Sequence, residues 1–581
     1  MRKVKKLLGL LLAAVMVLAM GVPTFAASGN YSITINDESS GHTYVAYQVF
    51  KGTVSDNGQT LSNVDWGDGV NGEALLAALK GPEETPTAYQ TCTSAAKVAE
   101  ILEGYADDSQ AIKEFSDIVG QHLSETTSGT LNAYDEVSKS YTISGLEAGY
   151  YFIKDADTVA ETDAYTDFIL KLTNDEAITR KADVPTVEKK VQEDDKDIIY
   201  GEEDDNYGKG YNDVADWNIG DAVPFKLIGT LPTNFADYDT YQYIFHDTLS
   251  TGLSLNQDTI HVYMASDKAG TMDKKELHGY TVNVPGTEEE NQCSFEVAFA
   301  DLTNSETVGE EVTADKYIIV EYTATLNKDA EIGLPGNPNK VYLEFSNNPN
   351  SGGEGDTGKT PEDKVIVFTY ELDATKVDGE DANTKLKDAE FVLYKEVDGV
   401  KQYAQVAQED QIDQETQEIT IKKGTIIGWA PAVSEIEDSI IYPENSTLKS
   451  DEEGLFKVSG LDDGTYWLKE TKAPDGYNLI TDPIRIVITA DTENDQHWEA
   501  TEGPEDALTK LEIGVTVGST ITSGTGNTES GIVATDIENN KGAELPETGG
   551  MGTTIFYVLG AILVLGAGVL LIARKRTDSE K

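Results

Sequence analysis

The sequence is poor in cysteine, histidine and basic side chains. It has 2 Cys and 6 His in 581 residues, and its 44 Lys and Arg are outnumbered by 103 Asp and Glu, for a formal net charge of −59. So strong a negative charge argues against nucleic acids and anionic membranes as partners. Two cysteines allow one disulfide at most, so disulfides are not the main cross-linking device.

Motifs of catalysis and of cofactor binding are also missing. The chain has no metal-ligand spacing, no nucleophile elbow and no glycine-rich phosphate loop. The acidic run 193–205 lacks the Asp and Asn spacing of a calcium loop, so we interpret it as solvated surface. His246 beside Asp247 has no Ser or Cys nucleophile motif to accompany it. We therefore expect no enzyme activity toward other molecules, no cofactor and no metal.

The N-terminus carries the first long apolar run. Basic residues at positions 2, 3, 5 and 6 precede an apolar core over 7–20 and a small-residue site near 24–26. This order predicts a secretory signal peptide over residues 1–26, which is removed from the mature protein.

The C-terminus carries the second run. The apolar segment 553–573 is long enough to cross a bilayer as a helix, and the basic cluster 574–576 holds the C-terminus in the cytoplasm. A pentapeptide precedes the segment: Leu545, Pro546, Glu547, Thr548 and Gly549. The order resembles the cell-wall sorting signal of Gram-positive surface proteins. The resemblance implies that a sortase cuts after Thr548 and passes the Thr acyl group to an amine.

Three domains are expected between these two signals. About 520 residues remain, which suggests three or four domains. A hinge-like step at 180–185 and a Gly/Pro-rich break at 347–361 favour three. The predicted organisation is 1–26 signal peptide, 27–180 first domain, 181–360 middle domain, 361–542 third domain and 543–581 sorting signal. Cys92 and Cys293 then fall in different domains, and we expect separate buried thiols.

Most of the chain is predicted to form strands. Short β-branched and aromatic segments such as 317–322, 365–370 and 484–488 alternate with turn residues. Many short strands without intervening helices predict an all-β fold of tandem Ig-like β-sandwich domains. The first domain departs from this pattern, because 94–105 and 109–123 have the apolar spacing of helices. We interpret them as a helical excursion on a sandwich.

An internal repeat relates the first domain to the third. Segment 143–155 parallels segment 458–470, and each runs from a Ser-Gly-Leu turn into an alternating strand that ends with an acid. These acids are Asp155 and Glu470. The first and third domains are therefore interpreted as versions of one sandwich.

The third domain carries the most specific motif. Segment 466–477, Tyr-Trp-Leu-Lys-Glu-Thr-Lys-Ala-Pro-Asp-Gly-Tyr, is similar to the E-box of collagen-adhesin B-type domains. Segments 372–378 and 537–542 resemble the first and last strands of that family. The resemblance implies a spontaneous amide bond between Lys376 and Asn539, promoted by Glu470.

The chemistry of such a bond needs these residue types in a dry core. Burial lowers the pKa of a lysine, so that its amine can be neutral and nucleophilic. Burial raises the pKa of a carboxyl group, so that it can polarise the amide carbonyl and relay a proton. Ammonia then leaves, and no cofactor is required.

The middle domain has a second candidate set. Alternation within 187–191 places Lys189 on an apolar face, and alternation within 343–347 does the same for Asn347. The region resembles the middle domain of Gram-positive backbone pilins, which implies a bond between these two residues promoted by Asp247. The next residue after each is an alternative: Lys190 and Asn348.

The pilin resemblance also implies an acceptor for the sorting signal. In backbone pilins this acceptor is a lysine of the next subunit, in a Tyr-Pro-Lys-like motif at the end of the first domain. The matching segment here is 177–185, which assigns the role to Lys181, although Thr179 and Arg180 replace the motif's aromatic residue and proline. Lys190 is the alternative. In the first domain Asp155 holds the E-box acid position, but no Lys–Asn pair stands out, and Lys51 is a weak candidate for its partner.

The resemblance spans essentially the full chain and implies a backbone subunit of a sortase-assembled pilus on a Gram-positive cell surface, with a role in adhesion. The implied partners are a class C pilin sortase, a housekeeping sortase, other copies of the chain, peptidoglycan, minor pilins and a host ligand. Two alternatives are a monomeric wall-anchored adhesin and a minor pilin.

Overall fold

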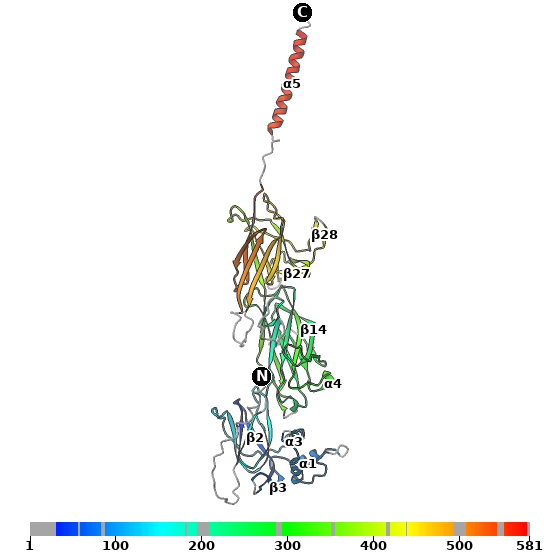
Figure 1. Cartoon of the computed structure of the whole chain (residues 1–581), viewed down its shortest axis with the longest axis vertical. Coiled ribbons are helices and arrows are strands. Elements are labelled where there is room, and N and C mark those ends of the chain that lie inside the picture. Colours follow the sequence, from blue (N-terminus) through cyan, green and yellow to red (C-terminus); the bar gives the residue numbers. More distant parts are fainter. Residues whose placement is uncertain are drawn as a thin grey trace, which may run out of the picture.

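The computed structural model is an elongated stack. Three β-sandwich units lie end to end, and a long helix extends beyond the third (Figure 1). The predicted signal peptide, the predicted linkage residue Lys181 and the pentapeptide 545–549 lie outside the described residues. The described residues are 31–55, 58–82, 87–107, 109–180, 183–194, 210–285, 293–349, 355–413, 419–436, 439–492, 507–542 and 551–577.

Two four-stranded sheets form the first unit, with strand orders β4-β5-β1-β8 and β3-β2-β6-β7. Alternating apolar residues of both sheets face one another, as in any sandwich. The strands are β1 (Tyr31–Asn36), β2 (Tyr44–Val54), β3 (Leu61–Trp66), β4 (Thr130–Leu131), β5 (Ser140–Leu146), β6 (Gly149–Asp155), β7 (Asp167–Leu172) and β8 (Glu176–Thr179).

Helices cover one side of this unit and form a second small core with β2 and β6. Helices α2 (Ala95–Leu102) and α3 (Gln110–Gly120) confirm the two predicted helices. A third helix, α1 (Gly72–Lys80), is absent from the prediction. Its signal is present in the sequence, because Asn71 caps its start and two leucines one turn apart face the core.

The second unit is a larger sandwich. Its sheets have the orders β10-β9-β12-β18-β14-β15 and β11-β21-β19-β13-β17-β16, with β20 also paired to β19. A short 3₁₀ helix η1 (Phe235–Asp237) and helix α4 (Ser305–Val308) lie in its connections. The strands are β9 (Val187–Gln192), β10 (Tyr211–Asn212), β11 (Val214–Asp216), β12 (Ala222–Gly229), β13 (Tyr243–Leu249), β14 (Leu253–Ala265), β15 (Lys275–Glu276), β16 (Thr281–Asn283), β17 (Phe295–Phe299), β18 (Tyr317–Leu326), β19 (Asn337–Ser346), β20 (Thr357–Lys359) and β21 (Asp363–Phe368).

The third unit pairs a small sheet, β31-β22-β36, with a large one, β27-β24-β23-β32-β33-β34-β35. Strand β30 joins the large sheet through β23, and two hairpins, β25–β26 and β28–β29, stand apart. The strands are β22 (Tyr370–Asp378), β23 (Glu390–Val397), β24 (Val400–Val406), β25 (Gln411–Ile412), β26 (Ile419–Ile421), β27 (Ile426–Ala430), β28 (Ser434–Ile436), β29 (Ser439–Ile441), β30 (Leu448–Lys449), β31 (Leu455–Leu461), β32 (Gly464–Lys472), β33 (Ile484–Thr492), β34 (Leu508–Val517), β35 (Thr520–Thr525) and β36 (Ile532–Asn539).

The predicted boundary between residues 360 and 361 is wrong. Strand β21 pairs with β19 and β11 of the second unit, so that unit extends to Phe368. Thr369 alone separates β21 from β22, the first strand of the third unit. The Gly/Pro-rich segment indicates a loop, but a loop in the sequence does not reveal which sheet the next strand joins.

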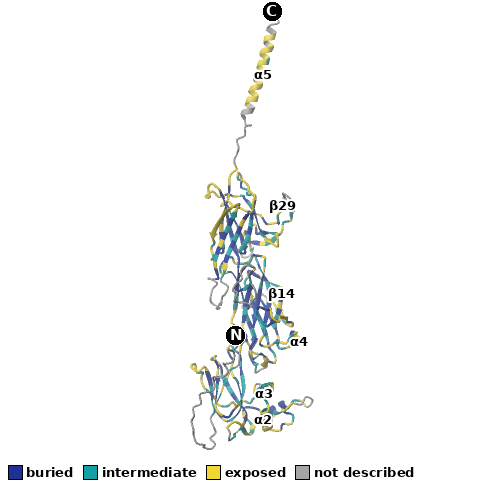
Figure 2. Cartoon of the chain, in the orientation of Figure 1, coloured by how far each residue is buried: buried dark blue, intermediate teal, exposed yellow. Residues whose placement is uncertain are grey.

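The second and third units share one continuous apolar core, whereas the first unit has two clusters of its own. Buried residues lie inside all three units (Figure 2). Ile219 N donates to Gly460 O at 3.0 Å, and the Tyr466 hydroxyl donates to Asn218 Oδ1 at 2.8 Å. Because core and hydrogen bonds cross this junction, we expect the two units to move as one rod.

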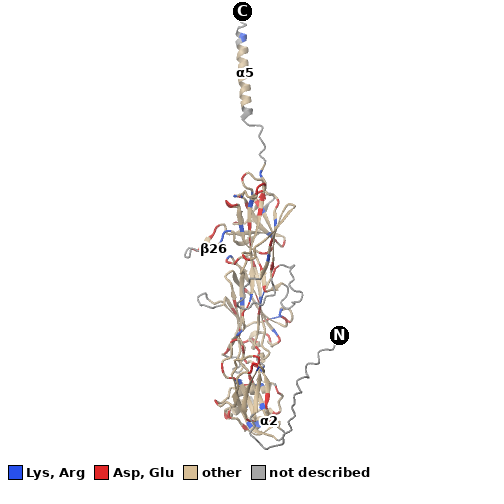
Figure 3. Cartoon of the chain, turned by 90° about the vertical axis from the view of Figure 1, so that its left-hand side faces the viewer, with Lys and Arg blue, Asp and Glu red and all other residues tan. Residues whose placement is uncertain are grey.

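Helix α5 (Met551–Thr577) follows the third unit and contains the apolar stretch Ile555–Ile572, of mean hydropathy 2.7. Its length and composition fit the predicted membrane span. Basic residues lie at its C-terminal end, and acidic residues are spread over all three units (Figure 3). Cys92 and Cys293 are free thiols, as expected, but only Cys92 is buried, whereas Cys293 is partly exposed.

Three acidic side chains are buried where the second and third units meet. Burial raises the pKa of Glu193 to about 7 and the pKa values of Asp216 and Asp462 well above their usual range. The carboxyl groups of Asp216, Asp462 and Asp463 offer oxygens within 4.8 Å of one another. The folded junction therefore holds protons that the unfolded chain releases above about pH 4.

We expect the junction to weaken as the pH rises from about 4.5 to 7. In this window the folded state binds more protons than the unfolded state, so the free energy of unfolding falls with pH, by up to about 1.4 kcal/mol per pH unit for each group that is protonated only in the folded state. Denaturant unfolding of wild type and Asp216→Asn at several pH values measures this fall in the free energy of unfolding. The fall should be smaller in the variant, which lacks one of the groups that bind a proton. Asp482→Asn, at an exposed position, is the control. An equal pH slope in all three proteins contradicts the expectation.

Candidate cross-linking sites

The first candidate site lies between the first and last strands of the third unit. Strands β22 and β36 run parallel, with Lys376 opposite Ile537 and Asp378 opposite Asn539. The Lys376 Nζ donates to Asn539 Oδ1 at 2.6 Å and to Ile537 O at 3.1 Å. The amine and the amide that the sequence pairs are thus in direct contact.

Glu470 reaches this pair from strand β32 of the opposite sheet. Asn539 Nδ2 donates to Glu470 Oε1 at 3.1 Å, and Lys376 Nζ lies 3.7 Å from the same oxygen. The backbone N–H of Ile480 donates to Glu470 Oε2 at 2.7 Å and fixes the carboxyl group. The three predicted side chains are each at most 2% exposed.

Local alternation explains why a lysine is buried here. In β22 the residues Tyr370, Leu372, Ala374 and Lys376 share the inward face, so the strand carries the lysine into the core after three apolar residues. Its ammonium group lies 5.7 Å from the centre of the Phe391 ring. Burial lowers the pKa of Lys376 to about 8, although Glu470 opposes the shift. Part of the amine is therefore neutral near pH 7.5, as nucleophilic attack requires.

The second unit holds a similar site around Lys189. This residue is fully buried in β9 and is paired with Asp247 of β13. Its Nζ also donates to the Tyr322 hydroxyl at 3.0 Å, and that hydroxyl donates to Asp247 Oδ2 at 2.8 Å. Burial lowers the pKa of Lys189 and raises that of Asp247, so the pair is poised to exchange a proton.

The asparagine at this site is Asn339, and the predicted Asn347 is wrong. Asn339 is fully buried, and its Nδ2 donates to the Tyr322 hydroxyl at 2.7 Å. Asn347 lies past the end of β19, where its Nδ2 donates to Asp163 O at 3.1 Å in the first unit. The strand register places Val341 opposite Asp247, so Asn347 lies six residues, roughly 20 Å, farther along.

Strand parity explains the error. Residues 337, 339, 341, 343 and 345 of β19 all face inward, and position 347 continues this alternation. Alternation therefore identifies the face of the sheet on which a residue lies, but not its position along the strand relative to the site. The alternative Asn348 is also excluded, because its Nδ2 donates to Asp356 Oδ2 at 2.6 Å, beyond the same end of β19.

Two further lysines are placed by the structure. Lys190 is buried and paired with Asp213, which makes it a poor acceptor for an external acyl group. Lys51 is half-exposed and paired with Asp68 at 3.0 Å. In the register of β2 with β6, Lys51 lies opposite Gly149, whereas Tyr44 lies opposite Asp155.

Asp155, the acid at the E-box position of the first unit, has a histidine as its partner instead. His42 Nδ1 lies 2.8 Å from Asp155 Oδ1, and the backbone N–H of Thr166 donates to Oδ2 at 2.9 Å. Burial opposes charge on His42, but its bonds to Asp155 and Asp163 outweigh burial and raise its pKa to about 9. A charged pair therefore occupies this position.

Three family models match separate parts of the chain. Residues 371–502 match a prealbumin-like fold domain, and residues 219–349 match the Cna-B-like domain of Gram-positive pilin backbone subunit 2. Residues 537–579 match the LPXTG cell wall anchor motif. The last match includes the predicted pentapeptide and confirms the prediction of a cell-wall-anchored protein of a Gram-positive bacterium.

Two curated proteins are similar in sequence. The trypsin-resistant surface T6 protein of Streptococcus pyogenes serotype M6 is 23% identical over 408 residues, which are 62% of this chain and 65% of that protein. The fimbrial subunit type 1 of Actinomyces viscosus is 34% identical over 128 residues, 22% of this chain and 18% of that protein. The chain thus matches just under two thirds of the first relative and about a fifth of the second.

Solved structures of pilins are similar as well. The T6 backbone pilin of S. pyogenes has 17% identity and a TM-score of 0.46, with 90% of this chain and 100% of that chain covered. The major pilin SpaD of Corynebacterium diphtheriae has 16% identity and a TM-score of 0.43, with 89% and 99% covered. The chain thus carries a region that matches the Cna-B-like domain of Gram-positive pilin backbone subunits, a prealbumin-like domain and an LPXTG anchor motif, and it is homologous to the T6 protein.

Proposed function

We propose that this protein is the backbone subunit of a covalent pilus. A pilin sortase of class C cleaves after Thr548 and joins the acyl group to Lys181 of the next copy, and a housekeeping sortase makes the final transfer to peptidoglycan. The observation that carries the proposal is the presence of pilin-backbone, prealbumin-like and LPXTG anchor matches in one chain. Minor pilins and a host ligand are further partners in this proposal.

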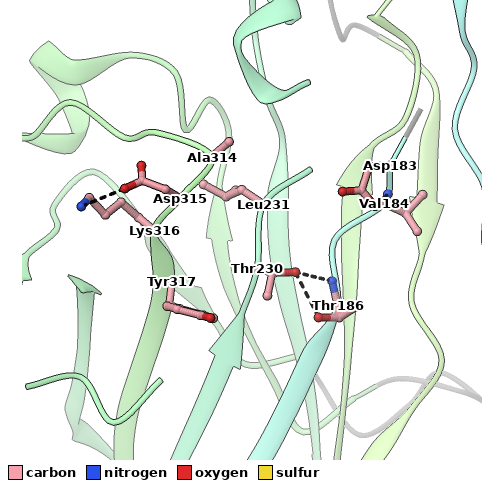
Figure 4. Close-up of a pocket in the computed structure, with 9 residues that line it drawn as sticks. All are labelled: Asp183, Val184, Thr186, Thr230, Leu231, Ala314, Asp315, Lys316 and Tyr317. Atoms are coloured by element: carbon pink, nitrogen blue, oxygen red, sulfur yellow. Dashed lines mark hydrogen bonds and ion pairs between the residues drawn. The ribbon is translucent and has the colours of Figure 1, made fainter. Parts of the chain in front are cut away.

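A surface hollow at the start of the second unit supports the proposal. The hollow has a volume of about 350 Å³ and is lined by Asp183, Thr186, Thr230, Leu231 and Tyr317 among others (Figure 4). Asp183 is two residues from Lys181 in the sequence, and an open hollow there offers room for a segment of another copy. Lys190, the alternative, is buried and already paired with Asp213.

The proposal includes an amide bond between Lys376 and Asn539. The lysine nitrogen attacks the asparagine side-chain carbonyl carbon, the new C–N bond forms, and the amide nitrogen leaves as ammonia. Glu470 is within reach of both nitrogens, so it can take a proton from the attacking amine and give one to the leaving group. The atoms balance as amine plus primary amide giving secondary amide plus ammonia.

A second bond is proposed between Lys189 and Asn339, promoted by Asp247. Tyr322 binds all three side chains through its hydroxyl, so it holds the amine and the amide near one carboxyl group. In each of two consecutive units, one bond would join the first strand to a strand near the end of the unit: β9 to β19 in the second unit and β22 to β36 in the third. A pull along the stack would then be carried by covalent bonds rather than by the hydrogen bonds of the sheets.

Intact mass tests both bonds. Each condensation removes one ammonia, about 17 Da, because the lysine amine displaces the amide nitrogen. The chain with both bonds should weigh about 34 Da less than its sequence predicts. Glu470→Gln and Asn339→Ala should each restore about 17 Da, after correction for the substitution itself. Asn347→Ala is the matched control and should restore nothing; if it restores about 17 Da, the assignment of Asn339 is wrong.

Stability tests the mechanical role of the third-unit bond. Lys376 and Asn539 are 163 residues apart. By analogy with disulfides, closing a loop of this length contributes about 5 kcal/mol to the free energy of unfolding. Glu470→Gln, which leaves the bond unformed, should lose about this amount in denaturant unfolding. A loss below about 1 kcal/mol, with the mass showing no bond, would contradict the role in stability.

Polymerisation is tested on the native host. Cell-wall extracts blotted for this protein should show a ladder that resists SDS, because the subunits are joined by amide bonds. Lys181→Ala should abolish the ladder and leave a wall-bound monomer, whereas Lys190→Ala should leave it intact. A monomer band alone in wild type would overturn the backbone proposal in favour of a monomeric adhesin, and a ladder in Lys181→Ala would move the linkage to another lysine.

A further inference from the structure

The outer face of the second unit holds a cluster of metal-ligand side chains that is separate from the cross-linking sites. His246 follows Phe245 and precedes Asp247 in β13, so it points outward where Asp247 points into the core. Glu296 of β17 lies directly opposite His246, and Cys293 lies two residues before the start of that strand. One imidazole, one thiol and one carboxylate therefore meet on adjacent strands of one sheet.

The spacing of these three groups fits one small metal ion. His246 Nδ1 lies 3.7 Å from Cys293 Sγ and 3.3 Å from Glu296 Oε1, and the sulfur lies 3.9 Å from that oxygen. A tetrahedral Zn²⁺ with ligand bonds of about 2.0–2.3 Å separates its nitrogen, sulfur and oxygen ligands by about 3.4–3.6 Å. Shifts of a few tenths of an ångström would bring all three onto one ion.

The other side of the imidazole is supported as well. His246 Nε2 lies 3.2 Å from Glu344 Oε2 of β19, and the ring stacks on Tyr342 with centroids 4.4 Å apart and planes 8° apart. A carboxylate beside Nε2 favours the tautomer with the proton on Nε2, which leaves the Nδ1 lone pair for a metal. The support is built into the sheet, because Tyr342 lies opposite His246 in the strand register.

We propose that His246, Cys293 and Glu296 form a site for a thiophilic divalent cation, best matched by Zn²⁺, with Glu344 as the positioning residue. The three ligands leave a fourth position open to water or to a side chain of another protein. On binding, the thiol gives its proton to solvent and the sulfur binds as thiolate. The thiolate and one carboxylate then balance the two charges of the ion.

The separation of the ligands along the chain explains why no metal motif is visible in the sequence. His246 and Cys293 are 47 residues apart, which matches no short metal-binding motif. Only the pairing of β13 with β17 brings them together. The same face is open to solvent, since Glu296 and Glu344 keep 26% and 21% of their side-chain surface exposed. The large negative charge of the chain also favours the approach of cations.

Cobalt is the probe of choice, because a thiolate bound to Co²⁺ gives a charge-transfer band in the near ultraviolet. We expect the purified full-length chain, kept reduced in detergent, to bind one Co²⁺ with this band and to release it to added Zn²⁺. Cys293→Ser should abolish the band. The matched controls are Cys92→Ser, which removes the buried thiol of the first unit, and His261→Gln, which removes another histidine near a glutamate, and both should keep it.

Glu344→Gln tests the positioning role. It should weaken Co²⁺ affinity about 10–100-fold, as expected for an outer carboxylate, while the melting temperature of the metal-free chain stays unchanged. Absence of the band in wild type, or its persistence in Cys293→Ser, would overturn the proposal. Loss of the band in Cys92→Ser would overturn it too, because it would place the ligand in the first unit.

Discussion

The burial of an amine beside an amide and a carboxyl group is the constraint on which the rest of this molecule depends. A buried lysine is costly unless it is paired, because its charge loses the hydration of water. Lys376 and Lys189 each have a carboxyl partner in a closed apolar core, Glu470 and Asp247. Condensation of the amine with an amide would remove the desolvation cost in a second way, because the charges of the ammonium and the carboxylate would then both disappear from the core. The desolvation that would destabilise an ordinary sandwich here supplies the reactivity.

The positions of the two sites along the stacked units determine which parts of the rod the proposed bonds would reinforce. The third-unit site joins its first and last strands, and the second-unit site lies one sandwich away along the same continuous core. The first unit differs, because His42 and Asp155 form a charged pair where the E-box acid would promote a bond. If both proposed bonds form, mechanical reinforcement is concentrated in the two units nearest the anchor helix, and the first unit depends on packing and hydrogen bonds.

The two faces of one strand show how closely separate roles can be packed. Asp247 points into the core toward Lys189, while its neighbour His246 points outward toward Cys293 and Glu296. Strand alternation separates an acid in the dry core from an imidazole on the outer face of the same sheet by one residue. The chain has few histidines and cysteines, but such a site requires only one of each. Strand pairing must place the two side chains next to each other.

The sequence by itself determined the fold class, two of the three helices of the first unit, the anchor signal and the set of Lys376, Asn539 and Glu470 that the structure brings together, because each rests on local patterns. Alternation puts Lys376 in line with three core residues, and a contiguous motif carries Glu470. Only the tertiary structure decided the rest: that Asn339 and not Asn347 reaches the Lys189 site, that β21 belongs to the second unit, and that Cys293 meets His246. Period-two alternation determines which face of the sheet a residue lies on. Its position along the strand relative to the site, its partner strand and the register depend on long-range pairing.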